Sequence, residues 1–343
     1  MKKIGLITLF AGLLFAACSS DDETNNLPTT NETITISYSV PRFGVEATTG
    51  MRAGTDPGSS AEQRVERLAL FLYTIDGNAV DPDPKIYVIS GATFTGGTWD
   101  KTDATGNEGT IKLSLKQGQA GQRYVYLVAN YPSTMDLSAA TYKNPNNLRI
   151  AQLGADTNPW STIGTPVEGR TKAPLLMTGK TAGAHNFVSQ PHLQTVSLIR
   201  AVAKVQLNIK LSQGYQDALT KGGNTQYKYR YVGFDRQTWF WKPDPKTTDA
   251  TTSAWTGWSN ELNTTVPTPD TGAGYKTASG KVTELSLTTY LNERDDLGAK
   301  IEIELPTVPI GPLPPPEFGP ELYTLPLPGK IERNTWYSYD VTI

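Results

Sequence analysis

The chain has little of the chemistry on which enzymes and metal proteins depend. Its 343 residues include a single cysteine, Cys18, and two histidines, His185 and His192. One cysteine excludes a disulfide within the chain, so an exported form must be held together by packing alone. Two histidines give neither a metal-binding cluster nor a Ser-His-Asp arrangement at a recognisable nucleophile turn. We therefore predict no metal site, no cofactor and no enzymatic activity.

An excess of charge of one sign is also missing. The 31 Lys and Arg residues nearly balance the 33 Asp and Glu residues, which leaves a formal net charge of -2, and no basic cluster stands out. Proteins that bind nucleic acids need a basic patch to neutralise phosphates, so no nucleic-acid partner is expected.

Two pairs of acidic residues have the spacing of chemical sites but fit structural roles. Glu302 and Glu304 could pair as glycosidase carboxylates, but they alternate with apolar residues and are interpreted as the solvent-facing side of a strand. Asp81 and Asp83 alternate with prolines, which is typical of a turn, and they lack the glycine-spaced acids of a calcium loop.

The apolar run near the start of the chain is shorter than a membrane span. Residues 1–17 begin with a basic pair, continue as this run and end in two alanines, an order that is typical of a signal peptide. Cys18 follows where a bacterial lipoprotein carries its lipid, although Phe15 stands where leucine is more usual. We predict acylation of Cys18 and outer-membrane attachment of the precursor. The alternative is an ordinary secreted protein with a chance cysteine.

What the chain does have is a pattern of short strands and turns. Glycine and proline are abundant and helical periodicity is scarce. Residues 33–40 alternate without exception, with Ile34, Ile36, Tyr38 and Val40 on one side and Thr or Ser on the other, which predicts a strand with one buried face.

Further strands are predicted along the rest of the chain. They are expected at 65–75, 85–90, 111–115, 123–129, 174–179, 194–199, 200–209, 227–234, 281–290, 300–305, 321–327 and 336–343. The organisation that we expect is a signal peptide at 1–17, a lipidated propeptide with a leash and the first strand at 18–52, and two domains at 53–195 and 196–343.

Two further features bear on function. A glycine-rich loop at 41–63, after the first strand, contains Arg42 and Arg52 and should be exposed. Trp239 and Trp241 would share one face of a strand and could stack on sugar rings, although core packing explains them equally well.

Several segments together resemble the FimA-type fimbrillins, the pilin superfamily of Bacteroidales type V pili. The resemblance comprises Cys18, the strand at 33–40, the arginine loop, VERLALFLYTIDG at 65–77, YVYLVAN at 124–130, RAVAKVQLNI at 200–209 and IERNTWYSYDVTI at 331–343. It implies an all-β fold of two tandem transthyretin-like Greek-key β-sandwich domains. It also implies a subunit without enzymatic activity that assembles with other pilin subunits outside the cell.

The resemblance further implies a route of assembly. In the family an arginine-specific protease cuts the lipoprotein precursor, the first strand leaves, and a strand from a neighbouring subunit takes its place. The corresponding bond here is Arg52–Ala53, with Arg42 and then Arg64 as the next candidates. Ile34, Ile36, Tyr38 and Val40 would be the exchanged side chains. The alternative is a permanent edge strand, in which case Arg52 is only a loop residue.

The end of the sequence suggests a position in the polymer. Shaft pilins of this family carry a further C-terminal appendage that acts as the donor strand, whereas this sequence stops at Ile343. We therefore expect a tip or minor accessory subunit of a cell-surface fimbrium, which would contact a host or bacterial surface ligand. The last strand, at 336–343, is an alternative donor. The competing function is that of a monomeric surface glycan-binding lipoprotein with Trp239 and Trp241 at its site.

Overall fold

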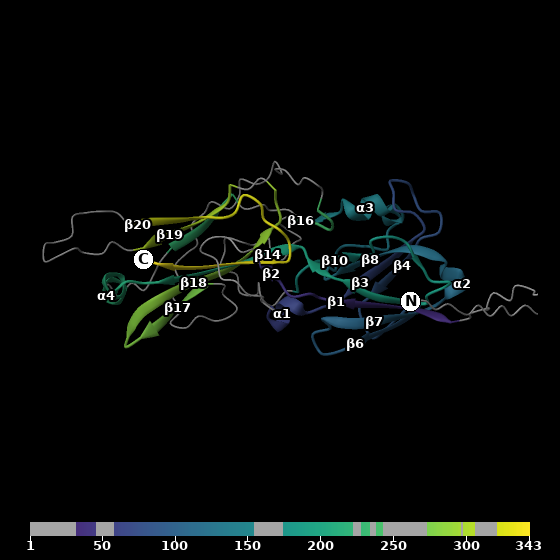
Figure 1. Cartoon of the computed structure of the whole chain (residues 1–343), viewed down its shortest axis with the longest axis horizontal. Helices are drawn as coiled ribbons and strands as arrows, with labels where there is room; N and C mark the ends of the chain where they lie inside the picture. The colour runs from purple at the N-terminus through teal and green to yellow at the C-terminus, as the bar shows by residue number, and fades with distance from the viewer. Residues whose placement is uncertain are drawn as a thin grey trace, which may run out of the picture.

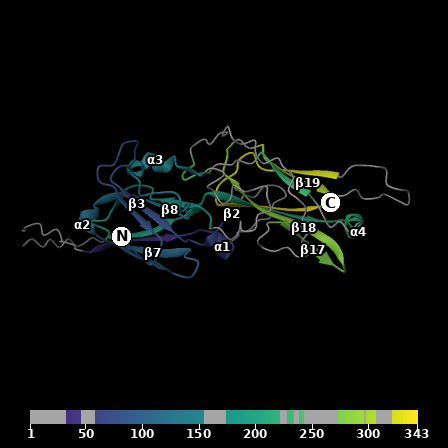
Figure 2. The same cartoon turned by 180° about the vertical axis from the view of Figure 1, so that it is seen from behind.

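The computed structural model describes residues 32–45, 58–153, 174–221, 228–233, 238–242, 273–295, 298–305 and 321–343. Over these residues the chain is built mainly of strands, arranged in two sandwiches that follow one another along the long axis of the molecule (Figures 1 and 2). The predicted all-β fold with two tandem β-sandwiches is confirmed. Cys18, Arg52 and Ala53 lie outside the described residues.

The first sandwich pairs two sheets around a common apolar core. One sheet has the order β12 (His192–Ser197), β1 (Thr33–Ser39), β7 (Glu108–Lys116), β6 (Gly97–Lys101) and β5 (Thr93–Phe94). The other has the order β13 (Ile199–Arg200), β10 (Met177–Lys180), β8 (Gln122–Ala129), β3 (Leu68–Tyr73) and β4 (Lys85–Ile89), with β11 (His185–Asn186) also paired to β8.

The strands β3 and β8 are buried on both faces. One face packs into the core between the sheets, and the other is covered by a second apolar cluster that includes Leu148 and Phe240. The covering elements are the 3-10 helix η1 (Ala140–Lys143), α3 (Pro145–Arg149), and the small sheet of β9 (Gln152–Leu153) with β16 (Thr238–Trp239). This double burial explains why the sequence of both strands is almost wholly apolar.

The second sandwich has a five-stranded and a three-stranded sheet around its own core. The larger has the order β17 (Ala273–Ala278), β18 (Lys281–Asn292), β14 (Val202–Lys210), β21 (Thr335–Thr342) and β2 (Gly44–Val45). The smaller has the order β15 (Lys228–Val232), β19 (Lys300–Leu305) and β20 (Glu321–Pro326). The strand β2 comes from the segment that follows β1. The expected exposed loop at 41–63 is therefore wrong at its start, where Phe43 is buried and the next two residues pair with β21.

The sandwiches meet where the chain passes from β13 to β14. The strands β12 and β13 pair with strands of the first sandwich, and β14 is the first long strand of the second. The predicted domain limit at residue 195 lies within β12 and remains a prediction.

Helices are few and short in the described part of the chain. Besides α3 they are α1 (Ser60–Gln63), α2 (Gln117–Ala120) and α4 (Gln213–Lys221). The alternating pattern of the sequence predicted none of them. Segments of four or five residues, such as α1, α2 and α3, leave no helical period to read, and α4 has only nine residues. No helix among the described residues has the length and apolar character that a membrane span requires.

Glu302 differs from its expected place on the solvent-facing side of β19. Its side chain is 4% exposed and forms ion pairs with Arg230, its cross-strand partner on β15, and with Lys300. Hydrogen bonding to Lys300 and Arg230 lowers the pKa of the Glu302 carboxyl. The carboxylate is buried because two cations on adjacent positions of the sheet compensate it.

Candidate functional site

The strand β1 buries one face completely. The side chains of Ile34 and Ile36 have no exposed surface and that of Tyr38 is 2% exposed, while Val40 is half-buried against the same core. Thr33, on the other face, is exposed. The structure thus brings the four predicted side chains together in the core of the first sandwich.

The position of β1 in its sheet is interior, so the alternative of an edge strand at 33–40 is wrong about the edge. It runs antiparallel to β7, where Ile36 lies opposite Ile111, and parallel to β12, where Ile36 lies opposite Leu193. In the strand order of this sheet β12 is at one end and β1 is next to it, so β12 pairs with the sheet through β1. Taking β1 away would therefore open a groove with backbone groups available for pairing on both sides.

Tyr38 anchors the strand through a buried polar contact. Its hydroxyl donates to the Gly106 carbonyl at 3.0 Å and accepts a hydrogen bond from Nε1 of Trp99 at 2.9 Å. Burial raises the pKa of the Tyr38 phenol well above its usual range, which keeps the group neutral. Gly109 makes room, since a Cβ at this position would lie 2.7 Å from the Tyr38 hydroxyl. The groove is therefore shaped for this ring as well as for aliphatic side chains.

The arginines considered for cleavage differ in their surroundings. The carbonyl of Arg42 accepts a hydrogen bond from Nδ2 of Asn334 at 2.8 Å, although its side chain is exposed. Arg64 is half-buried and pairs with Glu66 at 3.5 Å. Arg52 lies outside the described residues. Arg42 and Arg64 thus both interact with other residues of the folded chain.

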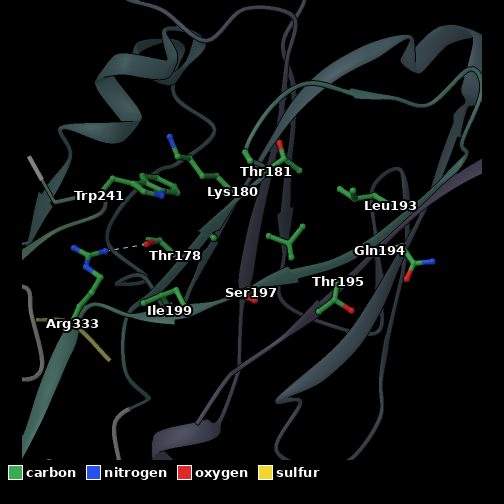
Figure 3. A pocket seen from close by; sticks show the side chains of 13 residues that line it. Thr178, Lys180, Thr181, Leu193, Gln194, Thr195, Ser197, Ile199, Trp241 and Arg333 are labelled. Atoms are coloured by element: carbon green, nitrogen blue, oxygen red, sulfur yellow. Dashed lines mark hydrogen bonds between the residues drawn. The ribbon is translucent and has the colours of Figure 1, made fainter. Parts of the chain in front are cut away.

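The second candidate site is a cleft at the junction of the two sandwiches. Trp239 and Trp241 are half-buried and line it together, in a cleft of about 600 Å³. An adjoining cleft of about 550 Å³ between β10 and β12 shares Lys180, Trp241 and Arg333 with it (Figure 3). The predicted strand is shorter than expected, because β16 ends at Trp239 and Trp241 follows in a bend.

The tryptophans are held by contacts on both sides. The ring of Trp241 packs edge-on against Tyr126, with centroids 5.1 Å apart. Arg333, from the turn before β21, donates to the carbonyl of Phe240 at 2.8 Å and to that of Trp239 at 3.1 Å. It also donates to the Thr178 hydroxyl at 3.3 Å (Figure 3). The second sandwich thus positions the aromatic wall of the cleft.

The charges around the cleft are largely paired. Three of its cations have acidic partners, and Lys180 extends over the Tyr126 ring, with Nζ 5.7 Å from the centroid. The pairs are Arg333 with Glu293, Lys242 with Asp295, and Arg149 with Asp76. This compensation suits the hydroxyl groups and apolar faces of a sugar better than it suits a polyanion.

Sequence reasoning did not find Arg333 and Lys180, which line both clefts, or Thr178, which lines the adjoining one. These residues come from distant segments, and nothing in the sequence near each of them indicates a shared site. Within the described ranges no three His, Cys, Asp or Glu residues cluster as metal ligands.

Two family models define the class of protein to which this geometry belongs. Residues 33–211 match the Major fimbrial subunit protein (FimA) family, and residues 201–342 match the family of the C-terminal part of the Minor fimbrium tip subunit MfA4. The chain therefore belongs to the fimbrillin family and is a fimbrial subunit, as the sequence resemblance implied.

A curated relative covers the whole chain. The Minor fimbrium tip subunit MfA4 of Porphyromonas gingivalis is 39% identical over 356 residues, which span 100% of both proteins. Solved structures with weaker similarity include a fimbrial assembly protein from Parabacteroides distasonis, at 15% identity and a TM-score of 0.40 over 90% of each chain. The fimbrial anchor protein Mfa2 from Porphyromonas gingivalis is 10% identical with a TM-score of 0.34, over 79% of this chain and 77% of that one.

Proposed function

We propose that this fimbrial subunit is exported as a lipoprotein precursor, is cleaved after Arg52 by an arginine-specific protease, and is assembled by exchange of β1 for a strand of another subunit. The lipid on Cys18 would hold the precursor at the outer membrane until cleavage. The observation that carries the proposal is the interior position of β1, whose buried face consists of Ile34, Ile36 and Tyr38. The role is structural and adhesive, without catalysis.

The burial energy supports exchange. Burying each side chain of this size stabilises the fold by roughly 1.5–3 kcal/mol, so a groove without β1 would bind a replacement strand favourably. The backbone hydrogen-bonding groups of β7 and β12 would stabilise binding further and favour an extended partner. A subunit that has lost β1 would therefore bind another strand rather than remain alone.

A place at the tip of the fimbrium, or as a minor component, rests on the relative rather than on the fold. MfA4 is named a tip subunit, and its similarity extends over the whole of this chain. A tip subunit would contact the surface ligand to which the fimbrium adheres.

Cleavage at Arg52 is favoured over the described arginines. Proteases need a locally extended and accessible chain. Arg42 is followed directly by the fully buried Phe43, and Arg64 is half-buried beside α1, so cutting at either requires local unfolding.

The test is the N-terminal residue of the protein recovered from surface filaments. We expect Ala53, and we expect Arg52→Ala to leave an uncleaved precursor outside the filaments. Arg42→Ala is the matched control and should be processed normally. Filament protein that still begins at lipidated Cys18 would contradict the proposal.

A second candidate function is saccharide binding in the cleft that contains Trp239 and Trp241. The half-buried rings and the paired charges favour a neutral sugar. Trp239→Ala with Trp241→Ala should abolish retention on an immobilised polysaccharide, whereas Trp241→Phe preserves packing against Tyr126 and should retain part of it. Unchanged retention with a lower melting temperature would show that these rings serve only the core.

A further inference from the structure

The segment that follows β1 crosses from the first sandwich to the second. Phe43 has no exposed surface, and the next two residues form β2, which runs parallel to β21 with Val45 opposite Trp336. The backbone N–H of Gly44 donates to the Asn334 carbonyl at 2.8 Å. In both views β2 lies at the middle of the molecule, between the two groups of strands (Figures 1 and 2). The N-terminal segment therefore belongs to both sandwiches.

Phe43 occupies a site that we name the Phe43 socket. It comprises Gly58, Arg200 and Lys204 around the ring, and Glu62 as the partner of both cations. The Arg200 guanidinium carbon lies 4.2 Å from the centroid of the ring, and Nζ of Lys204 lies 5.8 Å from it. A Cβ on Gly58, whose φ is +80°, would lie 3.3 Å from the ring. The socket thus places two cations within about 6 Å of the centre of one aromatic ring.

Arg200 is fixed in place by partners from both sandwiches. Its Nε donates to the Glu62 carbonyl at 2.9 Å, and its Nη1 donates to the Pro41 carbonyl and to Oδ1 of Asn334, each at 2.7 Å. Two of these partners, Glu62 and Asn334, lie outside residues 18–52. The guanidinium therefore keeps anchors when that segment leaves.

Glu62 balances the positive charge of the socket. Its carboxylate pairs with Lys204 at 3.1 Å and accepts a hydrogen bond from the Tyr290 hydroxyl at 2.5 Å. The Ser59 side chain caps α1 and accepts from the Glu62 backbone N–H, which holds this residue in position. The socket is thus built by residues that remain with the subunit after cleavage at Arg52.

We propose that the acceptor site for a partner subunit extends across the junction, and that the incoming strand must bring an aromatic side chain to the Phe43 socket before pairing with β21. This inference rests on the proposed exchange of β1. The spacing follows from the resident segment, in which Phe43 comes three residues after Val40 and five after Tyr38. The partner is therefore a strand with alternating apolar residues followed by an aromatic residue at that distance.

The choice of cleavage site decides whether the socket is vacated. A cut after Arg52 releases Phe43 and β2 with β1. A cut after Arg42 leaves Phe43 at the new N-terminus, where it can stay in its own socket. Filament protein that begins at Phe43 would overturn this inference while leaving strand exchange intact.

The test measures exchange of labelled peptides into the cleaved full-length chain. The protein is cut with an arginine-specific protease, the protease is inhibited, and fluorescent peptides are added, with incorporation followed by size-exclusion chromatography. The peptides are residues 33–45, the same peptide with Phe43→Ala or Phe43→Leu, and the shorter 33–40. The Arg42→Ala peptide is the matched control, because the Arg42 side chain is exposed.

We expect the 33–45 and Arg42→Ala peptides to be incorporated equally. The Phe43→Ala and 33–40 peptides should be incorporated at least about tenfold less, because the ring loses both its burial and its cation contacts. Phe43→Leu should fall between them. Equal incorporation of 33–45, Phe43→Ala and Phe43→Leu would overturn the socket proposal alone, whereas incorporation of none of the peptides would refute strand exchange and the inference with it.

Discussion

The two sandwiches hold their interior strands in different ways. In the second sandwich β14 lies between β18 and β21, and it follows directly from the body of the chain. In the first sandwich β1 lies between β12 and β7, and it precedes the loop that contains Arg42 and Arg52. A single cut after Arg52 would therefore detach β1 from the rest of the chain, whereas β14 would stay connected.

The sandwiches also differ in how tightly their cores are filled beside these strands. Ile34 and Ile36 of β1 have no exposed surface. In the second sandwich an apolar cleft of about 140 Å³ opens near the last residues, and Val341 and Ile343 are only partly buried. The apolar face of β1 is thus buried completely at Ile34 and Ile36, whereas β21 is buried at Tyr337 and opens towards its last residues.

The largest expected effect comes from a charge placed in each terminal strand. Ile36→Asp puts an unpaired carboxylate in a closed core and should lower the free energy of unfolding by about 4 kcal/mol or more. Val341→Asp, at the open end of the second sandwich, should cost about 1 kcal/mol. Urea unfolding of the uncleaved chain measures both. Equal losses would remove the asymmetry between the sandwiches.

A second prediction compares the precursor with the assembled subunit. Ile36→Ala and Ile209→Ala remove buried aliphatic side chains from the two cores, and each should cost about 2–5 kcal/mol in the precursor. After assembly only Ile209→Ala should remain destabilising, because Ile36 has left with β1. Thermal unfolding of isolated filaments checks this, and a persisting effect of Ile36→Ala would show that β1 stays in the mature protein.

A smaller effect is expected for the polar anchor of β1. Tyr38→Phe leaves the Gly106 carbonyl and the Trp99 indole N–H without their shared partner, at a cost of about 1–3 kcal/mol. A double-mutant cycle with Trp99→Phe isolates the hydrogen bond between the two rings. Additive losses in that cycle would mean that this hydrogen bond does not contribute.

The smallest expected effect is pH-dependent and belongs to the second sandwich. The pKa of Glu302 is lowered by its hydrogen bonds to Lys300 and Arg230, so its contribution is present above the unfolded-state pKa and is lost as pH falls through the folded-state pKa. Glu302→Gln should lower stability by about 1 kcal/mol at neutral pH, and the difference from the parent chain should disappear in acid. Melting temperatures measured from neutral to acidic pH test the sign, and a difference that grows in acid would contradict it.

Strand positions were readable from the sequence because burial of one face leaves an alternating pattern. Residues 33–40 predicted β1, and 300–305 predicted β19, with one strand boundary shifted by a residue and the other unchanged. The short helix α1 left no such pattern, since its capping box depends on only Ser59 and Glu62. Glu302 was misplaced because alternation predicts which face a residue occupies but not whether a cation covers that face.

A candidate site could be predicted from the sequence when its residues lie close together in the chain. Ile34, Ile36 and Tyr38 act within one strand, so their shared face was visible in the sequence. The sequence does not indicate Arg200 and Arg333 as site residues, because most of their hydrogen-bond partners lie more than 90 residues away along the chain.

The sequence by itself determined the all-β character, the fimbrillin resemblance and the apolar face of β1, because these depend on residue order within single strands. Only the tertiary structure decided that β1 is interior, that β2 reaches the second sandwich, and that Phe43 lies against Arg200. The physical reason is that hydrogen-bonded edges and cation contacts join segments that no local pattern relates. The N-terminal segment therefore acts on both sandwiches, which its sequence alone did not reveal.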